Sequence, residues 1–182
     1  QAQDDPLDIA NVIADTFRKS GYTVVVHHPN SESRPPSSGP RKGAGSGFFV
    51  SKRGLLVTNH HVIEGAEKIR VIPYGRKKLN ANVIATDSRN DLALIKVETS
   101  DFFPYLSIAD SESLRIGNEI KVIGYPLIDM MGLKPRVTEG IVSAKVGLED
   151  EIGTFQISAA IQPGNSGGPI LSEDFQVLGV AT

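Results

Sequence analysis

Short apolar runs of alternating pattern, separated by Gly, Pro, Asn and Asp, fill most of the chain after Gly21. Runs of this length and spacing are typical of the strands of barrels and sandwiches. The pattern therefore predicts a mostly β protein. The expected strands are residues 22–28, 46–51, 55–61, 68–74, 78–87, 92–97, 119–125, 136–146, 154–160, 168–172 and 176–182.

A polar stretch at residues 98–117 separates the strands into two groups. A change of composition of this kind is typical of a linker between two lobes. We therefore expect an N-terminal helical segment at 1–21, a first β lobe at 22–105 and a second at 106–182. No internal repeat relates the two lobes.

Residues 5–20 have the one helical pattern of the chain. Asp5 is placed as an N-cap, Pro6 in the first turn and Gly21 as the stop. The polar face mixes acidic and basic side chains, which favours a surface helix packed on the protein over a membrane-binding one. The apolar face consists of Leu7, Ala10, Ile13, Ala14 and Phe17.

Composition excludes several classes of protein. The 182 residues include no cysteine, so disulfides, thiolate metal sites and a cysteine nucleophile are excluded. Nineteen Lys and Arg against 21 Asp and Glu give no basic excess for nucleic-acid binding. No apolar run approaches the roughly 18 residues that span a bilayer. The histidine pairs at 27–28 and 60–61 have no carboxylate at ligand spacing, so we expect no metal and no other cofactor.

The strongest candidate for chemistry is the sequence GNSGGP at residues 164–169. Small flanking residues would let a substrate carbonyl approach the Ser166 hydroxyl, and a tight glycine turn can direct backbone N–H groups to one point. The alternative is a plain turn, because the same residue types are common in turns.

A serine nucleophile needs a base and a group that orients the base. His61 follows the apolar run 55–57, and Asp91 precedes the apolar run 92–95. The order His61, Asp91, Ser166 matches one of the three known chain orders of the Ser-His-Asp constellation. For Asp91 alone, an ordinary strand-start residue is the simpler interpretation.

The chain resembles the protease domain of the HtrA/Deg branch of the chymotrypsin-like (trypsin-fold) serine peptidases. The resemblance implies one peptidase domain with two six-stranded antiparallel β-barrel lobes. Because residues 179–182 match the strand that lines the family's substrate cleft, we expect the second barrel to be incomplete at the C-terminus. The matching segments are 45–48 (GSGF), 58–62 (TNHHV), 91–97 (DLALIKV), 124–126 (GYP), 137–143 (VTEGIVS) and 162–169 (QPGNSGGP).

The resemblance assigns the catalytic roles of a serine endopeptidase. Ser166 is the expected nucleophile, His61 the general base and then acid, and Asp91 the residue that orients the imidazole. The N–H groups of Gly164 and Ser166, with Asn165 between them, are the expected oxyanion hole. Neighbouring residues of a strand face opposite ways, so only one of the two adjacent histidines can serve, and the resemblance implies that it is His61.

The expected substrate pocket has no carboxylate. The resemblance implies that its floor falls at Ala160, followed by Ile161, and that Thr182 lies on the strand that lines the cleft. An unpaired Lys or Arg side chain is costly to bury, so we expect cleavage after small or medium uncharged residues. Ser158 and Gln162 stand where the family usually has Asp and Asn, so the resemblance does not imply a following PDZ domain.

The family implies protein or peptide substrates, including unfolded chains, and a homo-oligomer, a trimer formed through the N-terminal region. The chain opens with Gln1, and with the habits of the family this predicts export to the periplasm or cell envelope of a bacterium. Two alternatives remain. One is a latent or pseudo-peptidase that acts as a regulatory or peptide-binding module, with residues 127–136 and 147–153 as regulatory loops. The other is a β-rich carbohydrate- or peptide-binding domain.

Overall fold

The computed structural model describes residues 23–27, 44–110, 114–125, 135–146 and 153–182. The predicted helix at 5–20 lies outside these residues. Within them the chain forms strands and one helical turn, α2 (His60–Ile63). The strands are β1 (Thr23–His27), β2 (Ala44–Phe49), β3 (Leu55–Thr58), β4 (Ile69–Pro73), β5 (Leu79–Asp87), β6 (Leu92–Val97), β7 (Glu119–Gly124), β8 (Arg136–Ala144), β9 (Gln156–Ile157), β10 (Pro169–Leu171) and β11 (Val177–Val180).

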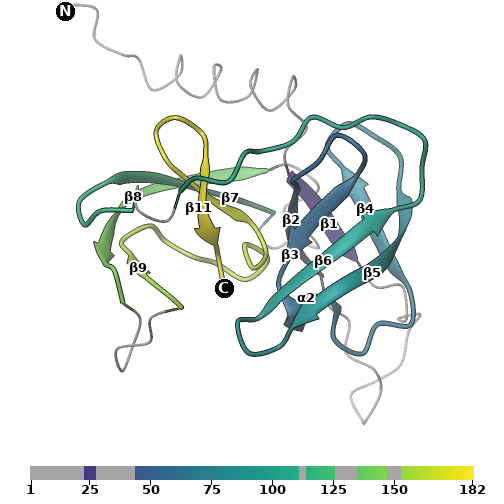
Figure 1. Ribbon diagram of the computed structural model, residues 1–182, viewed down its shortest axis with the longest axis horizontal. Coiled ribbons are helices and arrows are strands. Elements are labelled where there is room, and N and C mark those ends of the chain that lie inside the picture. The colour runs from purple at the N-terminus through teal and green to yellow at the C-terminus, as the bar shows by residue number, and fades with distance from the viewer. Residues whose placement is uncertain (1–22, 28–43, 111–113, 126–134, 147–152) are drawn as a thin grey trace, which may run out of the picture.

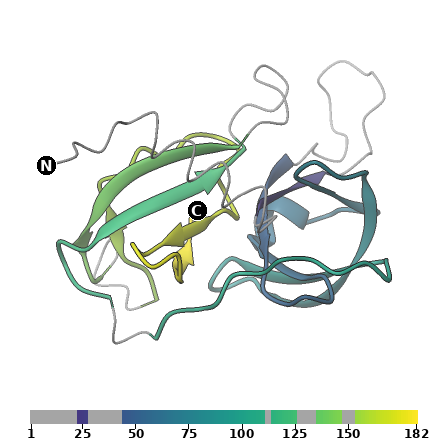
Figure 2. The same cartoon turned by 90° about the horizontal axis from the view of Figure 1, so that it is seen from above.

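The strands form two antiparallel sheets that lie side by side (Figures 1 and 2). The first is a closed barrel with the order β1-β2-β3-β6-β5-β4, and the second is a five-stranded sheet with the order β11-β10-β7-β8-β9. The predicted all-β class with two lobes is confirmed. The second sheet has one strand fewer than the first, as expected for an incomplete barrel.

Strand β2 belongs to both halves of the structure. Adjacent strand residues face opposite ways, so Phe49 packs into the first barrel while Phe48 packs between the two sheets. The cluster around Phe48 takes its other buried members from the connection between the sheets and from the second sheet: Leu106, Ile123, Leu171 and Val177. This cluster fixes the two sheets relative to each other.

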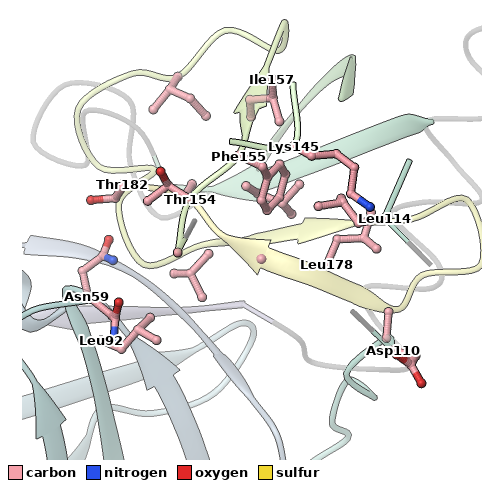
Figure 3. Close-up of a pocket in the computed structure, with 18 residues that line it drawn as sticks. Asn59, Leu92, Asp110, Leu114, Lys145, Thr154, Phe155, Ile157, Leu178 and Thr182 are labelled. Atoms are coloured by element: carbon pink, nitrogen blue, oxygen red, sulfur yellow. The ribbon is translucent and has the colours of Figure 1, made fainter. Parts of the chain in front are cut away.

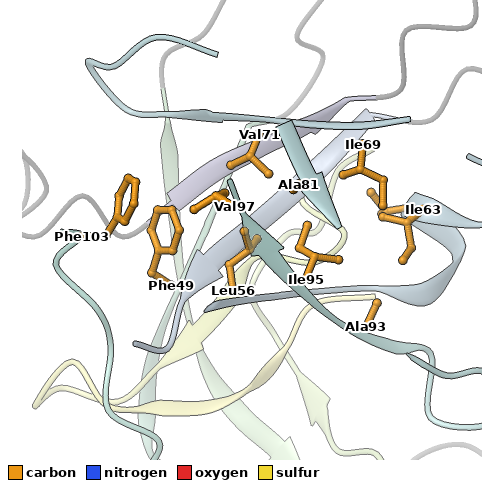
Figure 4. Close-up of a cluster of buried hydrophobic side chains, with 11 residues drawn as sticks. Phe49, Leu56, Ile63, Ile69, Val71, Ala81, Ala93, Ile95, Val97 and Phe103 are labelled. Carbon is orange, nitrogen blue, oxygen red and sulfur yellow. The ribbon is translucent and has the colours of Figure 1, made fainter. Parts of the chain in front are cut away.

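Each sheet also has its own apolar core. In the first barrel, β4 and β6 bury every second residue, and their side chains meet Phe49, Leu56 and Phe103 in the interior (Figure 4). The rings of Phe49 and Phe103 stack with centroids 4.2 Å apart. The second sheet buries Ile120, Val122, Val142, Ala159, Ile170 and Ala181.

Several predicted strands are shorter in the structure, and two of these changes lie in segments near the predicted site. Strand β3 ends at Thr58, and His60–Ile63 form a helical turn in place of the end of the predicted strand 55–61. The turn buries both Val62 and Ile63, which a strand with alternating faces would not do. Strand alternation is therefore the wrong reason for separating His60 from His61. The predicted strand 154–160 contracts to β9, Gln156–Ile157, where the ladder with β8 shifts register.

The core of the first barrel gives a matched test of packing. Ile95 is 0% exposed on β6, whereas Ile84, on the neighbouring strand β5, is 55% exposed. We expect Ile95→Ala to lower the free energy of unfolding by about 2–5 kcal/mol, because it leaves a cavity. The same change at Ile84 should stay within about 0.5 kcal/mol. Denaturant unfolding measures both, and equal losses would contradict this core.

Candidate active site

Buried polar side chains gather at the seam between the two sheets. Those of the described residues are Ser46, Thr58, Asn59 and Asn165. A buried polar group is costly unless it is hydrogen-bonded. The side chains of Ser46, Thr58 and Asn59 all donate hydrogen bonds to backbone carbonyls near the predicted catalytic residues. The buried polar interactions are therefore concentrated at this seam.

Asp91 is fixed by its backbone. Its φ of +52° lies in the left-handed region, which Asp and Asn tolerate better than most side chains. Its carbonyl accepts two hydrogen bonds, one from the backbone N–H of His60 (3.1 Å) and one from the side-chain amide Nδ2 of Asn59 (2.8 Å). These two bonds tie the start of β6 to α2 and hold Asp91 beside His61.

The Asp91 carboxylate accepts hydrogen bonds from both sheets. Oδ1 accepts the backbone N–H of His61 (2.9 Å), and Oδ2 accepts the Thr182 hydroxyl (2.9 Å). Oδ2 also lies 2.7 Å from Nδ1 of the His61 ring. The end of the chain after β11 accordingly points toward the first barrel in Figure 1.

The charge state of Asp91 determines the tautomer of His61. Burial alone would raise the pKa of Asp91, but the hydrogen bonds from His61 and Thr182 outweigh it, so the pKa lies below its usual 3.8. The carboxylate is then ionised at neutral pH and can only accept. Nδ1 of His61 must therefore carry the proton, which leaves Nε2 as an acceptor on the half-exposed side of the ring.

Before Ser166 the chain makes a tight turn over residues 162–165. The Asn165 N–H donates to the Gln162 carbonyl (2.9 Å), Pro163 occupies the second position and Gly164 the third, with a φ of +97°. Proline followed by a residue of positive φ is typical of a type II turn. Only glycine adopts this φ without strain.

The turn leaves two backbone donors unused. Among the described residues, the N–H groups of Gly164 and Ser166 have no acceptor, whereas the N–H of Asn165 is taken by the turn. Asn165 is itself buried, and its carbonyl accepts the Gly168 N–H (2.8 Å). Gly164 and Ser166 are thus the two donors that remain for an oxyanion, and Asn165 is the residue that spaces them.

Ser166 is held at the same seam as His61 and Asp91. Its carbonyl accepts the Ser46 N–H from β2 (2.8 Å), and the next N–H, of Gly167, donates to Ala181 (2.9 Å). A Cβ at Gly167 would overlap the Ser46 carbonyl, so only glycine fits there. Within the part of the chain that the structure describes, no hydrogen bond joins Ser166 Oγ to His61. The structure therefore pairs His61 with Asp91, and it shows no hydrogen bond from the Ser166 hydroxyl to any of the residues it describes.

A cavity of about 440 Å³ opens beside this seam (Figure 3). Thr182 and Asn59 lie at one end of it, and Lys145 and Asp110 lie far from them. Its lining also includes several large apolar side chains, those of Phe155, Ile157, Ile161, Ile170 and Leu178. Of the predicted pocket residues, Ile161 and Thr182 line this cavity. Ala160 is not among its lining residues, and its carbonyl accepts the Thr138 hydroxyl (3.1 Å).

Sequence reasoning missed two residues of the seam, Ser46 and Asn59. The signal for Ser46 is that it is the one residue with a polar side chain in the strand AGSGFF. Asn59 stands directly between a buried strand and the two histidines. Most of the proposed regulatory loops, 127–136 and 147–153, lies outside the described residues.

Two other features are absent from the described ranges. Nowhere in them do three or more His, Asp or Glu side chains gather as metal ligands would. None of the helices found there is long and apolar enough to cross a membrane.

Comparison with known proteins gives a consistent result. The family model of the trypsin-like peptidase domain matches residues 45–180. An uncharacterized protein, y4bJ, of Sinorhizobium fredii is 45% identical over 84% of this chain and 24% of its own length. A protein of Chlamydia muridarum, named a probable periplasmic serine endoprotease DegP-like, is 40% identical over 99% of this chain and 35% of its own length.

The fold is also found among solved structures. A structure of the HtrA-type protease AlgW with a tripeptide superposes with a TM-score of 0.74 at 27% identity, covering 93% of this chain and 53% of that one. The present chain spans about a quarter to a third of the length of the two curated relatives named above.

The hydroxyl of Thr182 gives a test of the Asp91 network. We expect Thr182→Val to raise the pKa of Asp91, because the variant removes a donor to the charged carboxylate. Carboxyl-carbon NMR over an acid titration measures this pKa. Thr138→Val, which removes a hydroxyl bonded to Ala160, is the matched control. An unchanged pKa in Thr182→Val would contradict the network.

The same substitution has a defined effect on acid stability. The folded pKa of Asp91 lies below its usual 3.8, so this carboxylate stabilises the fold above that pH. The stabilisation is lost as the pH falls through the folded pKa. Thr182→Val should therefore lose less stability than the native chain when the pH is lowered through this range.

Proposed function

The chain belongs to the trypsin-like peptidase family, in its HtrA/Deg-like branch, and on that premise we propose that it is a serine endopeptidase acting on protein substrates. The triad is His61, Asp91 and Ser166. The observation that carries the proposal is the pairing of His61 Nδ1 with an ionised Asp91, which leaves Nε2 as a base. A β-rich carbohydrate- or peptide-binding domain has no need of this pair.

The proposed reaction begins with a proton transfer. His61 Nε2 takes the proton of the Ser166 hydroxyl as Oγ attacks the carbonyl carbon of the scissile bond. Asp91 keeps the imidazole in the required tautomer and stabilises the imidazolium that forms. The same proton is then delivered to the leaving amine, and a water molecule repeats the sequence on the acyl-enzyme. In the free protein the bond from serine to histidine is absent, and such bonds often tighten only when substrate is bound.

The negative charge on the substrate oxygen is received by backbone donors. The unused N–H groups of Gly164 and Ser166 support this role, since both belong to one short loop next to the nucleophile. A donor of this type is typically worth about 3–4 kcal/mol of transition-state stabilisation. A latent peptidase would need these N–H groups turned away or occupied.

We assign the cavity that Ile161 and Thr182 line to the substrate side chain before the scissile bond. The labelled lining nearest Thr182 is uncharged, with Thr154, Asn59 and Leu92, and the two charged lining residues, Lys145 and Asp110, lie away from that end (Figure 3). Ala160 remains the proposed floor by resemblance. Burying a Lys or Arg side chain of the substrate would cost desolvation free energy that no opposite charge offsets. The proposed preference is for small or medium uncharged side chains.

Location and assembly are also proposals. DegP-like relatives are named periplasmic, which supports an exported bacterial protein. Unfolded proteins as substrates and a homotrimer rest on family resemblance.

An active-site probe tests the triad. A fluorophosphonate should label the native chain, and labelling should disappear in Ser166→Ala because the nucleophile is gone. Asp91→Asn should lower kcat by about 10⁴-fold, the loss expected when the imidazole has the wrong tautomer. Ser172→Ala is a matched control that should label normally, because its hydroxyl serves only a turn of the second sheet. No labelling of the native chain would favour the latent alternative.

A panel of peptides that differ only in the residue before the scissile bond tests the pocket. We expect Ala, Val, Ile or Leu to exceed Lys or Arg by more than about tenfold in kcat/KM, because a buried cation lacks a partner. Preferred cleavage after Lys or Arg would overturn the assignment. Loss of that preference in Asp110→Asn would then identify the charge responsible.

A further inference from the structure

Ser46 is completely buried, and all of its hydrogen-bonding groups are used. Its N–H donates to the Ser166 carbonyl (2.8 Å), and its carbonyl accepts the Thr58 hydroxyl (2.7 Å). Its own hydroxyl donates to the Gly164 carbonyl (2.6 Å) and accepts the Tyr125 N–H (2.9 Å). One residue of the first barrel thus contacts the nucleophile loop twice and the end of β7 once.

Ser46 donates hydrogen bonds to two carbonyls of the loop 162–167, which we call the nucleophile loop. These two carbonyls belong to alternate peptide groups of the loop. In the peptide group between Gly164 and Asn165, the carbonyl accepts the Ser46 hydroxyl and the N–H donates to the Gln162 carbonyl. In the peptide group between Ser166 and Gly167, the carbonyl accepts the Ser46 N–H and the N–H donates to the Ala181 carbonyl. Both peptide planes are therefore fixed at both ends, and each depends on Ser46 at its carbonyl end.

The unused N–H groups of Gly164 and Ser166 adjoin these fixed planes. The N–H of Ser166 belongs to the peptide between the two planes, and the N–H of Gly164 belongs to the peptide before them. Gly164 has no Cβ, so its backbone can rotate more freely than that of the other residue types of the loop. Its hydrogen bond to the Ser46 hydroxyl is the contact from the first barrel that limits this rotation.

We propose that Ser46 is a positioning residue, whose hydroxyl holds the loop 162–167 with the Gly164 and Ser166 N–H groups directed at the oxyanion. The proposal rests on the proposed peptidase function. Ser46 touches no substrate atom and acts through the peptide planes. Because β2 pairs with β3, and β3 leads to α2 and His61, the same residue sets the loop relative to the base.

Alanine is the informative substitution. Ser46→Ala keeps both backbone bonds and removes only the hydroxyl, so the Gly164 carbonyl loses this donor and the Tyr125 N–H loses this acceptor, while the packing hardly changes. We expect kcat on a peptide substrate to fall at least about tenfold, the factor that corresponds to one lost hydrogen bond. KM should stay within about twofold, because the loop contributes to the transition state more than to ground-state binding.

Ser51→Ala is the matched control. The Ser51 hydroxyl also bonds to a backbone group of the first barrel, the N–H of Leu55 (3.1 Å), but it does not contact the nucleophile loop. Its kcat should remain native. A fall of kcat and a rise of KM together in Ser46→Ala, with the same pattern in Ser51→Ala, would indicate a general loosening of the barrel and overturn the proposal.

Amide hydrogen exchange gives a second measurement that needs no activity. Exchange of the Asn165 N–H should become at least about tenfold faster in Ser46→Ala. Exchange of the Val97 N–H, which bonds to Gly54 inside the first barrel, should not change. Unchanged Asn165 exchange with native kcat would overturn the proposal. If the native chain cleaves no peptide, the peptidase function fails while the exchange comparison still decides the role of Ser46.

Ser46→Cys covers the case in which Ser46→Ala does not fold. The thiol is somewhat larger than the hydroxyl and is a weak donor. Its kcat and Asn165 exchange should lie between those of the native and alanine proteins. Native values for both in Ser46→Cys would contradict a role for the hydroxyl.

Discussion

The proposed base, His61, and the proposed nucleophile, Ser166, belong to different halves of the structure, so their relative position depends on how the two sheets are joined at one seam. The Ser46 N–H bond to the Ser166 carbonyl (2.8 Å) is the direct link from the first barrel to the nucleophile loop. From Ser166 the connection continues through Gly167 to Ala181, and the adjacent Thr182 returns to Asp91. These hydrogen bonds, with the chain between them, connect the two sheets both at Ser166 and at Asp91.

The seam combines two kinds of interaction that do different work. The apolar cluster around Phe48 and Ile123 supplies the burial that holds the sheets together, since apolar contact is favourable but has no direction. The polar residues next to it add direction. A buried hydroxyl such as that of Ser46 costs free energy unless its partners lie at defined distances and angles. Its presence therefore restricts the seam to one arrangement, whereas apolar contacts alone would tolerate several.

Local pattern was enough to predict most strands, because alternation along β4 and β6 reports directly which face is buried. The triad order and the motif GNSGGP were also visible in the sequence. What sequence could not show was set by tertiary structure. The helical turn at His60 forms because Val62 and Ile63 are both drawn into the barrel, against the β preference of the preceding run. The role of Ser46 depends on a partner 118 positions away along the chain.

The Asp91 carboxylate both orients the proposed base, His61, and links the two sheets. Its carboxylate accepts from His61 of the first barrel and from Thr182 at the end of the second sheet, and these bonds keep it ionised despite partial burial. Without the bond from Thr182, the charge would be less favoured and the link between the sheets would be weaker. A substitution on either sheet at this point therefore acts on the pKa of Asp91 and on the link between Asp91 and the Ser166 loop together. That coupling gives a physical reason for hydrogen-bonded polar residues at the seam, where apolar side chains alone could fill the space.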